Sequence, residues 1–217
     1  MCGVTFDLPE LRSLAEDLPR IDPLDDWQQI AKKVGRNMRR IAKELERGDI
    51  TPAVWRAKMD SAIRIGHVEA HMAGQRIAGA QGYAGEAQRI GRIIGDGESQ
   101  YLQGFLNDIL DGRYLDLDGT FRTQSVLSRQ MMYVNKTRAS ASTGFVYASS
   151  GNQFDWVLGA VEDHCDECPI MAAGGPYTEE TLYTVPGLAD HPCLTNCRCF
   201  LKRDDGVVGP LPFGVTV

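Results

Sequence analysis

The chain has 217 residues, of which 43% are hydrophobic and 24% are charged, and its formal net charge is −6. This composition is typical of a globular protein and excludes a disordered chain. No apolar run approaches the roughly 18 residues that a membrane-spanning helix needs, and we find no basic and apolar N-terminal pattern of a secretory signal. We therefore expect a reducing compartment, in which clustered thiols favour metal over disulfides.

Residues 24–47 give the clearest helical pattern. Their apolar residues recur every three or four positions and form one stripe, which is Trp27, Ile30, Val34, Met38, Ile41 and Leu45. Seven basic residues lie opposite this stripe, namely Lys32, Lys33, Arg36, Arg39, Arg40, Lys43 and Arg47. Thr51-Pro52 then predicts an N-cap followed by proline at the first position of a second helix, which extends to about residue 71.

Eight glycines between Gly66 and Gly97 interrupt the next part of the chain. Each glycine weakens a helix by up to about 1 kcal/mol relative to alanine. The apolar residues nevertheless keep a helical spacing, so we expect close-packed or interrupted helices here. Residues 98–111 and 121–140 again have helical periods, and the Asp- and Gly-rich residues 113–120 between them predict a loop.

The pattern changes at Thr143. Residues 144–148 and 154–158 are short runs rich in β-branched and aromatic residues, and residues 149–152 between them predict a turn. We therefore expect an α+β protein, mainly α-helical in residues 1–142. A small β-rich, cysteine-containing module would occupy residues 143–205, and an extended tail rich in Pro and Gly would occupy residues 206–217.

Five of the six cysteines fall within the predicted module. They form Cys165-Asp-Glu-Cys168 and, after an excursion of chain, His191-Pro-Cys193-Leu-Thr-Asn-Cys197-Arg-Cys199. Two thiol clusters separated in this way are typical of a tetrahedral metal site with sulfur and nitrogen ligands, most often a structural zinc. The candidate ligands are Cys165, Cys168, Cys193, Cys197, Cys199 and His191, which exceed the four that one ion needs. Cys165 and Cys168 are the firm pair, and His164 is a spare candidate.

Other roles for these cysteines stay open at this point. One or two disulfides, or free buried thiols, would also explain the cluster. A cysteine nucleophile would need a base and one exposed thiol of low pKa, and a redox role for Cys165-x-x-Cys168 would need a βαβ context that is missing here. Residues 151–205 contain ten acidic and three basic residues, a net charge of −7, which disfavours phosphate binding by the module.

The order of motifs in the last 60 residues resembles a known family. Trp156, the segment from Asp163 through Cys168 to Pro169, Pro186-Gly187, and the closing His191-Pro192 with residues 196–201 are similar to the C-terminal end of Mu-F-type minor head proteins of tailed bacteriophages. In that family a tryptophan-containing strand precedes the Cys-x-x-Cys turn, and His-Pro-Asn-Cys-Arg-Cys closes the motif. Cys193-Leu194-Thr195 interrupts this signature here, which leaves open whether His191 or Cys193 takes the family's histidine position.

The resemblance implies a virion structural protein of the phage head, assembled in the host cytoplasm. Its role would be head morphogenesis at the portal vertex or inner capsid, in several copies of a symmetric assembly. The implied partners are the portal protein, the major capsid protein, or both, with no membrane and no small-molecule substrate. The basic face of residues 24–47 would either meet packaged DNA or an acidic portal surface, or be an ordinary solvated helix face.

Two other functional classes compete with this interpretation. A zinc-ribbon nucleic-acid-binding regulatory protein would share the cysteine spacing, but the net charge of the module argues against it. An enzyme is not expected, since the chain has no glycine loop that would cradle a phosphate and no Ser/His/Asp set. His67 and His71 share one helix face, yet they lack the glutamate of a zincin motif, so we expect them to be ordinary core or surface residues.

Overall fold

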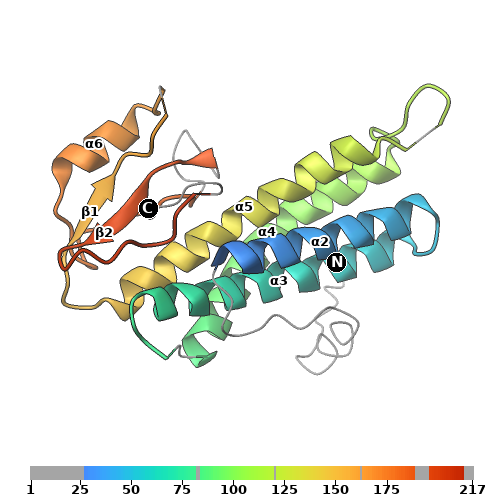
Figure 1. Ribbon diagram of the computed structural model, residues 1–217. Coiled ribbons are helices and arrows are strands. Elements are labelled where there is room, and N and C mark those ends of the chain that lie inside the picture. The colour runs from blue at the N-terminus through green and yellow to red at the C-terminus, as the bar shows by residue number, and fades with distance from the viewer. Residues whose placement is uncertain (1–26, 82–83, 120, 162, 189–195, 213–217) are drawn as a thin grey trace.

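A computed structural model describes residues 27–81, 84–119, 121–161, 163–188 and 196–212. Within these ranges the elements follow in the order α2 (Trp27–Glu46), α3 (Pro52–Ile77), α4 (Ala84–Leu110), α5 (Thr123–Ala148), β1 (Phe154–Val157), α6 (Glu167–Gly174) and β2 (Phe200–Arg203). The long helices form a bundle, and the two short strands and α6 lie together at one end of it (Figure 1). The predicted α+β class is confirmed.

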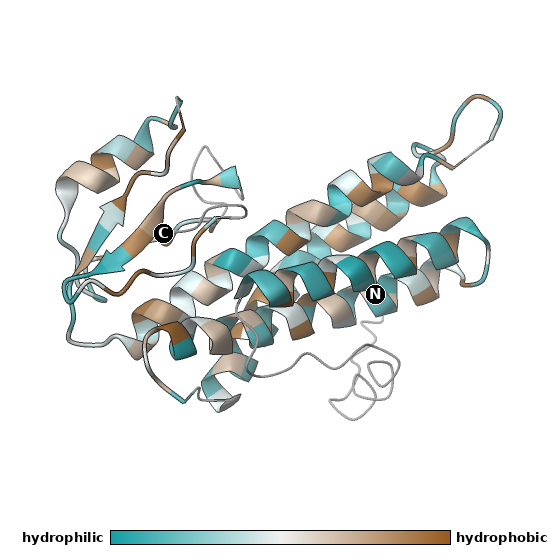
Figure 2. Cartoon of the chain, in the orientation of Figure 1, coloured by the Kyte–Doolittle hydropathy of each residue, from teal (hydrophilic) through white to brown (hydrophobic). Residues whose placement is uncertain are grey.

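Helix α2 has the amphipathic character that its sequence predicts. The apolar stripe is buried against the bundle, with Ile30 and Ile41 fully covered, while the outward side is hydrophilic (Figure 2). Of its basic residues, Lys32, Arg36, Arg39, Arg40 and Lys43 are exposed. Burial of the apolar stripe therefore decides which way the cations face. The predicted residues 24–26 lie outside the described ranges.

Helix α3 lies at the centre of the bundle and packs against α2, α4 and α5. It begins as predicted, because Thr51 accepts a hydrogen bond from the backbone N–H of Val54 (3.3 Å) and Pro52 occupies the first turn. It runs six residues beyond the predicted end at residue 71. The extension is possible because Ala73 and Gly74 are buried against α5.

Glycines in the bundle let helices approach more closely than side chains would allow. A Cβ at Gly74 would overlap the carbonyl oxygen of Ala141, and a Cβ at Gly144 would overlap that of His71. These contacts bring α3 and α5 together at the end of the bundle that carries the module. The expectation of close-packed, interrupted helices is therefore confirmed. The interruption falls after Ile77, where Gly79 has a φ of +92°. Helix α4 then covers the predicted residues 98–111 without a break as far as Leu110.

Residues 144–148 are helical, so the strand predicted there was wrong. Helix α5 extends through them to Ala148, and strand β1 pairs with β2 in the antiparallel register Phe154↔Arg203 to Val157↔Phe200. A helix is favoured over a strand here because it buries two residues one turn apart on the same helix. Phe145 is fully buried beside Phe154, with ring centroids 5.9 Å apart, and Ala141 is buried in the bundle. Tertiary packing has overridden the β propensity of Phe-Val-Tyr. Helix α5 thus crosses the boundary predicted at residue 142.

Two hydrophobic cores result, and α5 contributes to both. The first joins α2, α3 and α4 with Val126, Tyr133 and Val134 of α5. The second joins Phe145 and Val146 of α5 with the sheet and α6, including Trp156. The core of the module is therefore completed by α5, and this one helix fixes the position of the module relative to the bundle.

Residues 206–212 have no helix or strand and connect the module to the bundle. The backbone N–H of Gly209 donates to the carbonyl of Leu201 in β2 (2.8 Å). The amide of Gln28 in α2 donates to the carbonyl of Pro212 (3.3 Å). The rest of the predicted tail, residues 213–217, lies outside the described ranges.

His67 and His71 of α3 are both fully buried. The Nδ1 of His67 is hydrogen-bonded to the Ser140 hydroxyl of α5 (2.8 Å). Burial, assisted by the positive charge of Lys136, lowers the pKa of His67 from 6.5 to about 3. Burial also lowers the pKa of His71. Both imidazoles are therefore neutral in the folded protein at neutral pH, which is consistent with the core role expected from the sequence.

We predict that the bundle loses stability in mild acid because of these histidines. Between pH 6.5 and about 3 the unfolded chain binds a proton at His67 that the folded chain cannot bind, so the free energy of unfolding falls as the pH falls. For this one group the loss between pH 7 and pH 5 is about 2 kcal/mol. Urea unfolding followed by circular dichroism at both pH values measures it.

The control for this prediction removes the titrating group. In His67→Gln the pH dependence should be shallower than in the wild type. Equal pH dependence in wild type and His67→Gln would contradict the assignment.

Candidate metal centre

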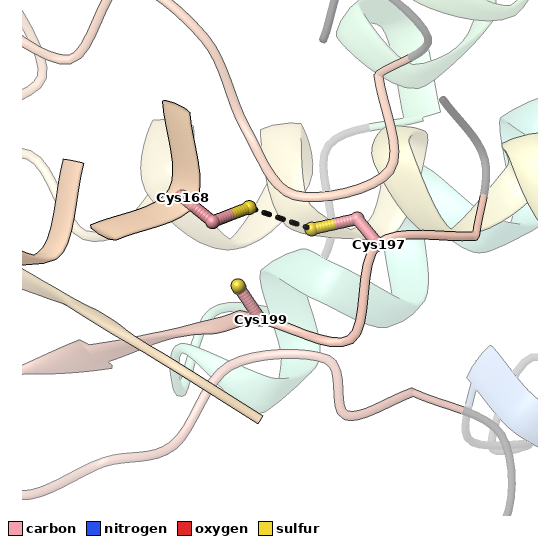
Figure 3. A group of neighbouring side chains, drawn as sticks. All are labelled: Cys168, Cys197 and Cys199. Carbon is pink, nitrogen blue, oxygen red and sulfur yellow. Dashed lines mark hydrogen bonds between the residues drawn. The ribbon is translucent and has the colours of Figure 1, made fainter. Parts of the chain in front are cut away.

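Four cysteines from the two predicted clusters come together in the module. Cys168 lies in the first turn of α6, and its backbone N–H donates to the carbonyl of Cys165 (3.1 Å), which closes the Cys165-x-x-Cys168 turn. Cys197 and Cys199 directly precede β2. Strand β2 pairs with β1, with Leu201 opposite Trp156. This pairing brings Cys199, the residue directly before β2, close to the Cys165-x-x-Cys168 turn. Figure 3 shows the thiols of Cys168, Cys197 and Cys199 pointing toward one another.

The distances between the sulfur atoms fit a common ion. The Sγ atoms of Cys168, Cys197 and Cys199 all lie within 4.8 Å of one another. The Cys168 and Cys197 sulfurs are 3.9 Å apart, and those of Cys165 and Cys168 are 3.2 Å apart. Four thiolates at about 2.3 Å from a tetrahedral zinc would be about 3.8 Å from one another. A disulfide would need about 2.05 Å, and all four of these cysteines are free thiols.

The surroundings of the thiols oppose an isolated negative charge. Cys168, Cys197 and Cys199 are buried, and Cys165 is half-buried. Burial, followed by the hydrogen bond with Cys165, raises the pKa of Cys168 far above its usual range. The hydrogen bond with Cys197, followed by burial, does the same to the pKa of Cys199. These thiols therefore stay protonated unless a cation replaces the protons, which is the usual exchange when a thiolate site takes up a metal ion.

The structure brings three of the six predicted ligands together around one point, Cys168, Cys197 and Cys199. The sulfur of a fourth, Cys165, lies 3.2 Å from that of Cys168. Cys193 and His191 lie outside the described residues. The spare candidate His164 has its Nδ1 4.0 Å from the Sγ of Cys199. The three buried cysteines can hold a metal ion, and the position next to them is taken by Cys165, with His164 close by.

One residue of this site has no signal in the sequence. The guanidinium of Arg138, on α5, donates from Nη1 to the carbonyl of Cys197 (2.6 Å) and from Nη2 to the carbonyl of Cys199. Its Nε donates to the carbonyl of Pro210 (3.2 Å). Arg138 is 59 residues from Cys197, so no local spacing connects them.

No family model, curated protein or solved structure matches the chain significantly. Among the described residues, no helix combines the length and the apolar character needed to cross a membrane. Any functional assignment therefore rests on the cysteine cluster and on the motifs around it.

We predict that Cys168→Ser disorders the module and spares the bundle. Cys168 packs in the second core only, so α2, α3 and α4 keep their contacts. Trypsin should then cut at Lys202 and Arg203 in β2 several-fold faster than in the wild type, while most of the helical circular dichroism remains. Cys2→Ser, a cysteine far from the cluster in sequence, is the matched control. An unchanged digestion pattern in Cys168→Ser would refute a stabilising role for the cluster.

Proposed function

We propose that Cys165, Cys168, Cys197 and Cys199 bind one structural zinc ion. The mutual closeness of the Cys168, Cys197 and Cys199 sulfurs carries this proposal. Cys165 is the fourth ligand in this proposal because its sulfur lies 3.2 Å from that of Cys168. Soft thiolate ligands favour zinc over magnesium, calcium or manganese. Four protein ligands would leave no open position on the ion, which favours a structural role over catalysis. Cys193 and His191 are the alternatives to Cys197 and Cys199 that the sequence offers for the second pair of ligands.

Such an ion would stabilise a module whose own helix and strands are short. The sheet has two strands of four residues each, and α6 has eight residues. A two-stranded sheet of this size is marginally stable in water. A structural zinc in a small module supplies roughly 10 to 16 kcal/mol of apparent binding free energy, which is ample for this purpose.

On this basis we propose that the protein is a phage minor head protein of the Mu-F type. The support is the order of its motifs, since the tryptophan strand β1, the Cys165-x-x-Cys168 turn and the Asn196-Cys197-Arg198-Cys199 segment follow one another as in that family and meet at one site. A helical body precedes them, as the family resemblance implies. The protein would act in head morphogenesis at the portal vertex or inner capsid, in several copies, without enzymatic activity.

The exposed cations of α2 suggest how such a protein meets its partners. Five exposed basic residues lie on the outer side of this helix in a chain of net charge −6. In this proposal α2 faces an acidic portal or capsid surface or the packaged DNA, and the acidic module faces away from nucleic acid. A zinc-ribbon regulator would instead need a basic footprint on the module itself.

We predict about one zinc ion per chain in protein purified under reducing conditions, measured by elemental analysis. Cys168→Ser should lower this ratio severely, because a tetrahedral site loses one of its ligands. If zinc is well below one per chain and the wild-type thiols resist alkylation until reductant is added, the cysteines form disulfides and the zinc proposal is wrong.

The virion role has a separate test. In particles purified from cells that produce the phage encoding this chain, mass spectrometry should detect the chain in far fewer copies than the major capsid protein. Labelling of the chain should place it at the portal vertex or on the inner shell. Complete absence of the chain from such particles would overturn the head-protein proposal and leave the metal proposal untouched.

A further inference from the structure

Arg138 connects the helical bundle to the candidate metal centre. It is only 3% exposed and lies on α5, one residue before Ala139, which is itself part of the second core. All three of its donor nitrogens point at backbone carbonyls of the segments that follow, two in the Cys197–Cys199 segment and one at Pro210. A buried arginine used in this way orders loops that have no strand or helix partner of their own.

The shape of the guanidinium imposes a geometry on the cysteine segment. Its nitrogens lie in one rigid plane, so the carbonyls of Cys197 and Cys199 must converge on that plane. Fixing both carbonyls fixes the backbone on each side of Arg198 and, with it, the directions of the two thiols. Both thiols are buried facing Cys168.

We propose that Arg138 is a positioning residue of the metal centre, which presents Cys197 and Cys199 as a preformed pair to the ion. This inference rests on the proposed zinc site. Arg138 also places a permanent positive charge directly behind two of the ligands. A site with four thiolates and one divalent ion carries a charge of −2, which a neighbouring cation stabilises. Affinity for metal is thereby linked to the packing of α5 in the bundle.

Lysine cannot replace this arrangement. Its ammonium is a single point charge on a flexible stem, so it keeps the positive charge without holding two carbonyls in one plane. Comparing Arg138→Lys with Arg138→Gln therefore separates the contribution of the charge from that of the geometry.

The test uses the full chain and Co²⁺ as the probe, because cobalt bound by four thiolates absorbs visible light in a way that reports ligand type and geometry. We expect Arg138→Gln to weaken Co²⁺ binding by about 10- to 100-fold, the range usual for residues that orient metal ligands. Arg138→Lys should recover part of the affinity but not the wild-type spectrum. The spectrum is the readout that a general loss of bundle stability would not change.

Arg129→Lys is the matched control. This arginine also lies on α5 and is part-buried, but it pairs with Asp108 and Tyr114 inside the bundle. It should bind Co²⁺ with wild-type affinity and spectrum. Circular dichroism of each variant checks that the helices are formed, and if Arg138→Gln does not fold, Arg138→Lys decides the question by its spectrum.

The outcomes separate the two proposals. Wild-type affinity and spectrum in the folded Arg138 variants would overturn the role of Arg138 and leave the metal site intact, as would equal losses in Arg129→Lys. A wild-type chain that binds neither Co²⁺ nor Zn²⁺ would overturn the metal site and, with it, this inference.

Discussion

The packing of α5 into both hydrophobic cores is the constraint on which the rest of the structure depends. Val126 and Val134 lie in the core of the bundle, and Phe145, further along the same helix, lies in the core of the module against Phe154. Gly144 lets this end of α5 approach α3 at the backbone of His71. Because one helix serves both cores, the cysteine cluster is held at a fixed place relative to the bundle without a linker.

Hydrogen bonds also connect the bundle to the module, and most of them are accepted by backbone carbonyls in loops. Arg138 of α5 reaches the cysteine segment, and Arg203 of β2 reaches back to the carbonyl of Ala78 (3.1 Å) at the end of α3 and to the hydroxyl of Ser149 (3.2 Å). Gln28 of α2 donates to Pro212. Each contact supplies a donor to backbone or side-chain oxygen in irregular chain, where neither helix nor sheet provides one. The junction is therefore specified by hydrogen bonds as well as by apolar burial.

The parts that sequence patterns predicted are those determined by local periodicity or by side-chain chemistry. The stripe of α2, the Thr51-Pro52 start of α3 and the pairing of the two cysteine clusters all belong to this kind. The predictions that failed concern parts of the structure that are determined by long-range contacts. Residues 144–148 have β propensity but are held helical by α3 and the module, and β1 pairs with residues 200–203 rather than with its neighbour in sequence. Arg138 could not be recognised, because its partners are carbonyls about 60 residues away.

The sharing of α5 also bears on the order in which the protein is completed during its synthesis. The bundle helices are all made once residue 148 has left the ribosome, but Phe145 then lacks the β1 and β2 residues that cover it. Cys168 is followed by Cys197 only 29 residues later, which takes about 1.5 to 6 seconds at about 5 to 20 residues per second. For that interval the nascent chain exposes an aromatic surface and half of a thiol cluster. Both are closed only when the segment that contains Cys197, Cys199 and β2 has been translated.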